Sequence, residues 1–366
     1  MEPIDLGVVT PWNARCGISE NCAYLLAALP PGMFRVSIFS NRVAETLRAD
    51  GPEVTRPWEN NADTTDQLCR AIAARRCRVV LIQYHFGFYP VAVLGSLIDR
   101  LTNRGIKVFV IYHCTQHDSE NLSRIAPAMA RAALNIVHNQ TDLDLFSSLR
   151  LTNVRKIPLG VYQPTAGRRK TQPPSSRPMF AIGSFGFLMP HKGVIELLGA
   201  AHLVRQHVPD IRIKLYHALY PSKDSAQYLT HCEAYVDYLG IRREVEFVTS
   251  FLELNEVISR LSDCDLVAFP YQRSSESASA SVRMGIASGS PTLCTPLPIF
   301  DEFRGLVHFS HGCDAFGLAD SILEAYRDPG ILEGVRKSQQ QFLAIHSWPR
   351  IAEVLTKEIR SQAATP

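Results

Sequence analysis

The sequence predicts an α/β protein made of two Rossmann-like, doubly wound domains that face a central cleft. Short β-branched runs alternate with segments of helical periodicity along the chain, as in parallel sheets that helices cover on both faces. The chain has 366 residues, which is more than one ordinary hydrophobic core holds. A segment rich in Pro, Ser and basic residues, 163–178, shows no periodicity and divides the alternation in two.

The first part of the chain, residues 1–163, is expected to form an N-terminal domain. Because ligands of doubly wound sheets bind beyond the carboxyl ends of the strands, residues that directly follow a strand are candidates for the site. The expected strands lie at 6–10, 35–40, 79–84, 107–113, 134–139 and 155–160. The expected helices lie near 19–29, 65–75, 90–103, 121–133 and 140–149.

The second part repeats this alternation after a linker at 164–178, and is expected to form a C-terminal domain over 179–345. A last amphipathic segment follows within 346–366. The expected strands lie at 179–186, 211–219, 245–251, 265–272, 291–295 and 306–310. The expected helices lie near 193–207, 224–240, 254–262, 276–288, 315–326 and 330–344.

Composition narrows the class of protein. Hydrophobic residues make up 46% and charged residues 20%, and a net charge of +3 is too small for a nucleic-acid partner. The nine cysteines form no Cys-x-x-Cys pair, which predicts free thiols in a reducing compartment. The N-terminus lacks the pattern of a signal peptide, and no apolar run is long enough to span a membrane. We therefore expect a cytoplasmic protein, with peripheral membrane contact left open.

Two positions in the N-terminal part follow predicted strands and suit a ligand. Gly17 precedes a helix, where backbone N–H groups can approach an anion; a plain strand–helix turn capped by Ser19 is the alternative. His113 ends a buried strand, where it either acts on a substrate or bonds to the backbone as a core histidine. A metal site at His113, Cys114 and His117 lacks a fourth ligand, so no metal is expected.

Lys192 is the first candidate in the C-terminal part. It stands directly before Gly193 and a long helix, after a strand and a glycine-containing loop. There its ammonium can neutralise a phosphate held at the helix end, whereas a lysine without a ligand is unfavourable beside the positive end of a helix dipole. A solvated lysine is the alternative.

The segment "SSESASASVRMGIASGSPTLCT", 274–295, is the second candidate. If its helix starts near Glu276, then Glu276, Ala280 and Arg283 share one face, because residues four and seven apart return to the same side. The small hydroxyl side chains of Ser277 and Ser279 would leave room for a sugar or phosphate at the helix start. A carboxylate that simply stabilises the first turn is the alternative.

In this order, the segments resemble those of the retaining glycosyltransferases of family 4, which have the GT-B fold. The resemblance covers nearly the whole chain, through "CGISENCAYLL", "KIPLGV", "GSFGFLMPHKGVIELLGA", "VTSFLELNEVISRLSDCDLVAFPY" and "ESASASVRMGIASGSPTLCT". It implies that the C-terminal domain holds a nucleotide-sugar donor and the N-terminal domain an acceptor. It also implies that the helix in 346–366 crosses back to the N-terminal domain, anchored by Trp348; a helix that stays on its own domain is the alternative.

The resemblance also implies roles for individual residues. Lys192 would neutralise the donor diphosphate, and Gly17 would approach that diphosphate or the acceptor. His113 would face the transferred sugar. Glu276 would take the first place of the family's E-x7-E motif and contact the sugar.

The nucleoside of the donor is implied to lie beside Phe251 and Leu252, which would flank its base and ribose. The family uses no metal cofactor, because lysine, arginine and helix dipoles neutralise the diphosphate instead. The donor is a substrate, either GDP-mannose or a UDP-sugar, with mannose favoured by the resemblance.

Two positions depart from the family pattern. The second glutamate of E-x7-E falls at Met284, so the ribose contact must come from elsewhere. The arginine usually placed six residues before the lysine falls at Gly186. Arg283 is our candidate for the missing positive charge, with Arg273 as a second choice.

The function that the resemblance implies is a hexosyltransferase of bacterial cell-surface polysaccharide or lipopolysaccharide synthesis, acting on a glycan or lipid-linked acceptor. Basic groups such as Arg75, Arg76 and Arg78 could contact an anionic membrane that holds such an acceptor at its inner face. Two alternatives stay open. A nucleotide-sugar epimerase of the same fold would act without an acceptor, and a sugar-binding pseudoenzyme would bind without turnover.

Overall fold

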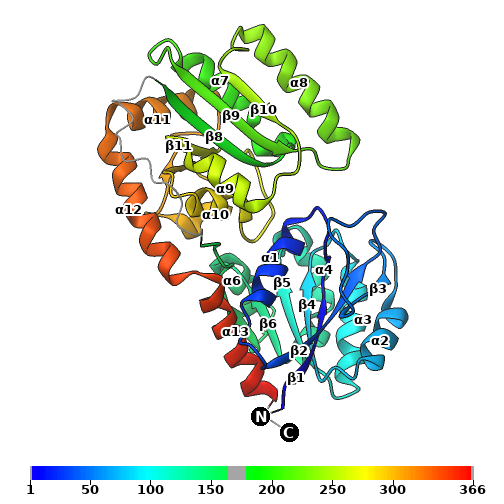
Figure 1. Ribbon diagram of the computed structural model, residues 1–366. Coiled ribbons are helices and arrows are strands. Elements are labelled where there is room, and N and C mark those ends of the chain that lie inside the picture. The colour runs from blue at the N-terminus through cyan, green and yellow to red at the C-terminus, as the bar shows by residue number, and fades with distance from the viewer. Residues whose placement is uncertain (1, 164–178, 364–366) are drawn as a thin grey trace. The chain divides into compact units, whose positions relative to one another are not determined.

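The computed structural model describes residues 2–163 and 179–363, and confirms the predicted α/β class with two parallel sheets (Figure 1). The chain divides into two compact units. Unit 1 comprises residues 2–160, 275–278 and 346–363 of the described chain, and unit 2 comprises 161–163, 179–274 and 279–345. The linker expected at 164–178 lies outside the described residues.

Unit 1 is built on a seven-stranded parallel sheet with the strand order β3-β2-β1-β4-β5-β6-β7. This order reverses between β1 and β4, as in doubly wound sheets, so ligand-binding residues are expected at the carboxyl ends of these strands. The strands are β1 (Ile4–Val9), β2 (Phe34–Asn41), β3 (Val54–Trp58), β4 (Val79–Tyr84), β5 (Lys107–Tyr112), β6 (Leu134–Val137) and β7 (Val154–Lys156).

Helices cover this sheet on both faces. Along β4 the side chains alternate, so Val80 and Ile82 pack against α2 and α3 in one apolar core, while the buried Leu81 points to the opposite face. The helices are α1 (Gly17–Ala27), α2 (Thr65–Ala74), α3 (Val91–Thr102), α4 (Ser119–Arg124), α5 (Ala126–Arg131), α6 (Gln140–Ser148) and α13 (Trp348–Ala363), with a 3-10 turn η1 (Gln116–Asp118).

Three expectations for this unit were wrong in detail. The strand β3 was not expected, because Pro57 interrupts its pattern; proline is tolerated there because β3 is the edge strand. The helix expected at 121–133 is two short helices, since Pro127 has no N–H to continue the first one. The strand expected at 155–160 ends at Lys156, before Pro158.

The last helix, α13, belongs to unit 1 and packs beside α1 (Figure 1). Its first residue, Trp348, lies with its ring centroid 6.3 Å from that of Tyr24 on α1. A side chain at Gly160 would place its Cβ only 2.4 Å from the Trp348 ring, so glycine is required for this approach. The Trp348 ring therefore holds the start of α13 against the end of the first domain.

Unit 2 is built on a six-stranded parallel sheet with the order β10-β9-β8-β11-β12-β13. Its strands are β8 (Phe180–Phe187), β9 (Ile211–Ala218), β10 (Val245–Val248), β11 (Leu266–Phe269), β12 (Thr292–Cys294) and β13 (His308–Phe309). Its helices are α7 (Val194–Val204), α8 (Lys223–Leu239), α9 (Leu254–Ser262), α10 (Ala280–Ala287), α11 (Ala315–Arg327) and α12 (Pro329–Ile345), with 3-10 turns η3 (Pro190–Lys192) and η4 (Pro298–Phe303).

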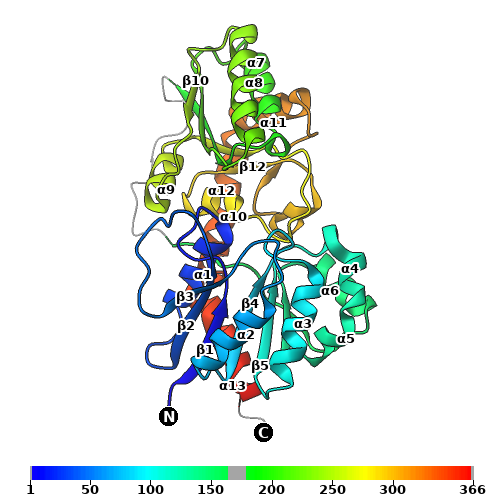
Figure 2. The ribbon, with the colours of Figure 1, turned by 90° about the vertical axis from the view of Figure 1, so that its right-hand side faces the viewer.

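Two apolar cores lie on the two faces of this sheet. In β11, Leu266 and Ala268 belong to the core under α7, α8 and α11, whereas Val267 and Phe269 belong to the core under α9 and α10. Figure 2 shows α7, α8 and α11 side by side. A strand buried on both faces is apolar throughout, which is why the continuous apolar runs of the sequence predicted this class.

Candidate functional site

The described residues place each candidate at or after the carboxyl end of a strand, or at a helix start. In unit 1 the structure brings together Gly17, His113 and Glu276. The remaining candidates lie in unit 2, apart from Ser277, which belongs to unit 1 with Glu276.

His113 directly follows β5 and is held by hydrogen bonds on both backbone and side chain. Its backbone N–H donates to the Tyr84 carbonyl at 3.0 Å, and its Nε2 lies 2.6 Å from Oε1 of Gln83. Burial lowers the pKa of His113 well below its usual value, and the neighbouring rings of His138 and His85 act in the same direction. The imidazole is therefore neutral near pH 7.

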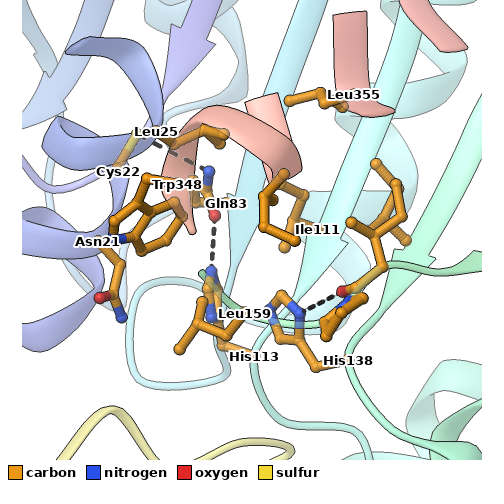
Figure 3. Close-up of a pocket in the computed structure, with 14 residues that line it drawn as sticks. Asn21, Cys22, Leu25, Gln83, Ile111, His113, His138, Leu159, Trp348 and Leu355 are labelled. Atoms are coloured by element: carbon orange, nitrogen blue, oxygen red, sulfur yellow. Dashed lines mark hydrogen bonds between the residues drawn. The ribbon is translucent and has the colours of Figure 1, made fainter. Parts of the chain in front are cut away.

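A small cavity of about 30 Å³ lies beside His113 (Figure 3). Most of its wall is apolar, with Leu25, Ile111 and Leu355 among the lining residues, and the rings of His138 and Trp348 also face it. This volume holds about one or two water molecules, whereas small-molecule sites measure several hundred Å³. The cavity is thus a packing space beneath His113 and not a sugar-sized pocket.

Gly17 is the first residue of α1, and its backbone is open to solvent. A Cβ built on it would meet no atom within 4 Å, so a ligand could approach the first-turn N–H groups there. The N-cap is Cys16 and not Ser19, whose hydroxyl instead accepts a hydrogen bond from the Ala14 N–H at 3.4 Å. The helix thus begins two residues earlier than the sequence predicted.

The segment 275–278 of unit 1 holds Glu276 between two anchored neighbours. The Ser277 N–H donates to the His113 carbonyl at 3.0 Å, and the Asn139 Nδ2 donates to the Ser277 carbonyl at 2.6 Å. The Cys114 thiol donates to the Ser275 carbonyl at 3.0 Å. Glu276 itself is exposed, and the Ser277 hydroxyl is buried without a hydrogen-bond partner among the described residues.

Glu276 lies near the start of α1. Burial raises the pKa of the Cys16 thiol, and the negative charge of Glu276 adds to that effect, which places the carboxylate within electrostatic range of Cys16. The backbone contact of Ser277 with His113 and the effect of Glu276 on Cys16 therefore place Gly17, His113 and Glu276 in the same part of unit 1.

The helix expected at 276–288 begins only at Ala280, so the prediction that Glu276 shares a helical face with Ala280 and Arg283 was wrong. Ser279 is the N-cap, and its hydroxyl accepts the Val282 N–H at 3.2 Å. Serine side chains compete with the helix for backbone groups, so a run of serines favours a late start. Glu276 consequently lies on extended backbone outside α10.

Arg283 does not offer a free positive charge. The side chain is 0% exposed, and its guanidinium donates to both carboxylate oxygens of Glu302, at 2.9 and 2.6 Å. It also lies 5.1 Å from the ring centroid of Phe303. This geometry opposes our expectation that Arg283 neutralises a donor phosphate, because Glu302 already balances its charge.

Met284, at the position of the family's second glutamate, is buried in the core under α9 and α10. A carboxylate at this position would be buried among apolar side chains, so methionine suits the packing of this chain. The departure from the motif therefore coincides with a core position.

Lys192 ends the turn η3 and is only 8% exposed. Its Nζ lies 3.9 Å from the ring centroid of Tyr271, which stabilises the buried ammonium. Gly193 follows with φ of 73°, and a Cβ there would lie 1.7 Å from the Pro270 carbonyl oxygen. Glycine lets the connection from β8 to α7 turn tightly past Pro270, which follows β11, and this turn fixes Lys192 at the helix start.

Gly186 stands where the resemblance predicts an arginine, and it lies near the end of β8 in a polar environment. A Cβ there would lie 3.5 Å from the Ser281 hydroxyl and 3.9 Å from the ring of His217. His217 is 1% exposed, with Nε2 at 3.0 Å from the Ser184 hydroxyl and Nδ1 at 3.5 Å from the Phe187 carbonyl. Burial lowers the pKa of His217 to about 4, and the charge of Lys192 acts in the same direction.

Sequence reasoning missed His217, although the signal was present. It stands near the end of the predicted strand "IRIKLYHAL", much as His113 ends "KVFVIYH". Both histidines therefore stand at the carboxyl ends of parallel strands, one in each sheet.

Phe251 and Leu252 lie between β10 and α9, and Phe251 belongs to an aromatic group that the sequence did not reveal. The Phe187 ring centroid lies 6.1 Å from that of Phe251 and 5.3 Å from that of Tyr220. Tyr220 is 45% exposed, while Leu252 packs on the core under α9 and α10. The three rings therefore lie at or just after the carboxyl ends of three neighbouring strands, β8, β9 and β10.

The described parts of residues 2–163 and 179–363 contain neither a metal-binding cluster nor a membrane-spanning helix. Among the side chains that the structure describes in these ranges, no three from His, Cys, Asp or Glu are placed to hold one metal ion. In the same ranges, no helix is both long and apolar enough to cross a bilayer. All nine cysteines are free thiols, and all except Cys16 and Cys313 are buried, as the sequence predicted for unpaired cysteines.

Comparison with known proteins gives matches in structure alone. No protein-family model matches the chain, and no curated protein matches its sequence. Among solved structures, sucrose-phosphate synthase from Thermosynechococcus elongatus is similar with 14% identity and a TM-score of 0.78, over 99% of this chain and 100% of that chain. Anabaena HepE in complex with UDP is similar with 16% identity and a TM-score of 0.74, over 98% and 100%.

A glycosyltransferase from Rickettsia africae is similar over 100% of both chains, with 11% identity and a TM-score of 0.75. Identities this low establish the fold and nothing finer. The chain therefore has the two-sheet α/β architecture of the GT-B glycosyltransferases, over its full length.

Proposed function

We propose that this chain is a retaining glycosyltransferase of the family 4 type, which transfers a sugar from a nucleotide-sugar donor to a glycan or lipid-linked acceptor. The observation that carries the proposal is Lys192, a buried ammonium fixed at the start of α7, at the carboxyl edge of a doubly wound sheet. A buried cation at such an edge suits an anionic ligand, because helix N-termini and strand ends bind phosphates.

Unit 2 holds the donor in this proposal. Lys192 and the first-turn N–H groups of α10 neutralise the diphosphate, while Gly186 leaves space for it beside Ser281. Ser279 caps α10 and so orients those N–H groups. Phe251, with Phe187 and Tyr220, stacks on the base.

Unit 1 acts on the sugar and the acceptor. Glu276 and the neutral His113 contact sugar hydroxyls, and the N–H groups at Gly17 approach the diphosphate or the acceptor. Departure of the nucleoside diphosphate needs positive charge more than it needs a base. The acceptor hydroxyl then attacks on the face that the diphosphate vacates, and a diphosphate oxygen takes its proton.

For the donor, the sequence resemblance favours GDP-mannose. HepE, whose structure is similar, was solved in complex with UDP-glucose. We place the reaction in bacterial cell-surface polysaccharide or lipopolysaccharide synthesis, in the cytoplasm at the inner membrane face. Any lipid-linked acceptor would be presented there.

A turnover assay with a panel of nucleotide sugars tests the proposal. The panel contains GDP-mannose, UDP-glucose, UDP-galactose and UDP-N-acetylglucosamine, with simple sugars as acceptors. Release of nucleoside diphosphate is measured, and proton NMR gives the anomeric configuration of the product. We expect release with one donor, a product of retained configuration, and at least a 100-fold loss of turnover in Glu276→Gln and Lys192→Ala.

Three outcomes would overturn the proposal. An inverted product would exclude the retaining mechanism. An isomerised nucleotide sugar without acceptor would identify an epimerase. Donor binding without turnover, in the wild-type chain as in the variants, would identify a sugar-binding pseudoenzyme.

A further inference from the structure

The imidazole of His113 is the first member of a chain of hydrogen bonds inside unit 1 (Figure 3). Gln83 lies in β4 and is 3% exposed. Its amide oxygen lies 2.6 Å from Nε2 of His113, and its amide nitrogen lies 3.7 Å from Sγ of Cys22. Figure 3 shows both interactions, which join the middle of α1, the end of β4 and the residue that follows β5.

The two ends of the Gln83 amide have opposite roles. The nitrogen donates to the Cys22 sulfur, so the oxygen is left to accept, and His113 must donate to it from a protonated Nε2. An imidazole that is neutral and carries its proton on Nε2 has a lone pair on Nδ1.

The hydrogen bonds beyond Cys22 are consistent with this direction of donation. Burial raises the pKa of Cys22 to about 12, so Cys22 stays a thiol, and the Thr10 side chain is its other hydrogen-bond contact. The Thr10 hydroxyl donates to the Pro11 carbonyl at 3.1 Å, and a carbonyl oxygen can only accept. The hydrogen bonds of His113 to Gln83, of Gln83 to Cys22 and of Thr10 to Pro11 are therefore consistent with one another in direction.

The surroundings of His113 also keep it uncharged. The titratable groups that face it are the rings of His138 and His85, and each opposes a positive charge on His113. The His138 ring lies 5.2 Å away between centroids. A carboxylate in place of the Gln83 amide would instead favour the imidazolium, so the amide is the side chain that accepts from Nε2 without adding charge.

We infer that Gln83 is a positioning residue, which fixes His113 as the neutral tautomer protonated on Nε2 and leaves Nδ1 as a hydrogen-bond acceptor. His113 then recognises ligands that donate, such as a sugar hydroxyl, and rejects phosphate and carbonyl oxygens, which can only accept. The identity of the ligand rests on the proposed function, whereas the tautomer does not.

The tautomer is measured directly on the ligand-free, full-length chain. Uniform ¹⁵N labelling and long-range ¹H–¹⁵N correlation spectra separate protonated from unprotonated ring nitrogens, and the variant His113→Asn assigns the signals. We expect Nε2 protonated and Nδ1 unprotonated near pH 7. A proton on Nδ1, or an imidazolium, would overturn the inference.

Two variants test whether Gln83 causes this state. In Gln83→Met, which has a similar shape but no acceptor, we expect a mixture of the two neutral tautomers. In Gln83→Glu we expect His113 to titrate at higher pH than in the wild type. The exposed Gln67→Glu on α2 makes the same chemical change elsewhere in the unit and should leave the His113 signals unchanged.

Kinetics connect the tautomer to the reaction. We expect kcat/KM of Gln83→Met to fall roughly 3- to 10-fold, the effect of one neutral hydrogen bond. In Gln83→Glu the acidic limb of the pH profile should move to higher pH, which a merely structural defect would not cause. An unchanged pH profile in Gln83→Glu contradicts the inference, whereas a wild-type chain without transferase activity contradicts only the proposed function, since the spectra still decide the tautomer.

Discussion

The backbone N–H of Ser277 donates to the carbonyl oxygen of His113 at 3.0 Å. Through this hydrogen bond a residue far along the chain is fixed to the carboxyl end of β5. Glu276 is the neighbour of Ser277, so its backbone position depends on the same contact. The placement of the carboxylate is thus set by main-chain geometry, which a change of side chain at 276 would not disturb.

Variants of Asn139 test whether this contact positions Glu276, because the oxygen and the nitrogen of the Asn139 amide make different hydrogen bonds. Its Oδ1 accepts the Asp142 N–H at 2.7 Å and caps α6, while its Nδ2 donates to Ser277 at 2.6 Å. Asn139→Asp keeps the cap but loses the donor, so we expect near-wild-type stability and a roughly 3- to 10-fold fall in transfer rate. Asn139→Ala loses both, which adds about 1 kcal/mol of destabilisation.

Thermal unfolding and transfer assays on the two variants separate the effects. Equal activity in Asn139→Asp and the wild type would show that the hydrogen bond to Ser277 does not position Glu276.

Gly193 is expected to be intolerant of any side chain. Its φ is 73°, and a Cβ would lie 1.7 Å from the Pro270 carbonyl oxygen. Gly240 has a similar φ of 64° but open space around it, so Gly240→Ala measures the backbone cost alone, about 1 kcal/mol. Gly193→Ala should destabilise by several kcal/mol in urea unfolding. Equal losses in the two variants would mean that the approach to Pro270 is not tight.

Arg283 is expected to serve stability and not donor binding. Its guanidinium is buried against Glu302, so Glu302→Gln leaves an unbalanced buried charge and should cost about 3 kcal/mol in urea unfolding. The affinity for donor in the folded variant should stay within about twofold of the wild type, since neither side chain contacts it in this account. A donor affinity at least tenfold weaker at unchanged stability would restore Arg283 as a phosphate ligand.

His217 is expected to make stability depend on pH. Its folded pKa is about 4, whereas that of an unfolded histidine is about 6.5, so the unfolded chain binds more protons between these values. Stability should therefore fall as the pH drops from about 6.5 to about 4, by about 3 kcal/mol from this residue. The slope should flatten in His217→Gln and persist in the exposed His207→Gln. If stability changed with pH in the same way in the wild type and in both variants, a buried neutral His217 would be contradicted.

The strands were largely predictable from the sequence, because strands buried on both faces are apolar at nearly every position. All six residues of β4 are buried, and the run "VVLIQY" predicted that strand at its full length. The edge strand β3 could not be found in the same way, since Pro57 is a strand breaker except at an edge, and edge position is a property of the whole sheet.

The candidate site was predictable only in part, because position along the chain does not reveal hydrogen-bond partners. His113 and Lys192 were identifiable from their places after strands. The pairing of Arg283 with Glu302 joins residues from α10 and the turn η4, which no periodicity in the sequence connects. Gln83 appeared to be an ordinary strand residue, and only the contact with His113 gives it a role.

The most direct test of the central claim is equilibrium binding of nucleotide sugars by isothermal titration calorimetry. Wild type, Lys192→Ala and Lys223→Ala are titrated with the four nucleotide sugars of the turnover panel. Lys223 is an exposed lysine at the start of α8 and serves as the matched control. The account predicts that one donor binds the wild type, that Lys192→Ala binds it roughly 10- to 100-fold more weakly, and that Lys223→Ala binds it equally well. Binding of none of the four donors, or equal affinity in Lys192→Ala and the wild type, would contradict it.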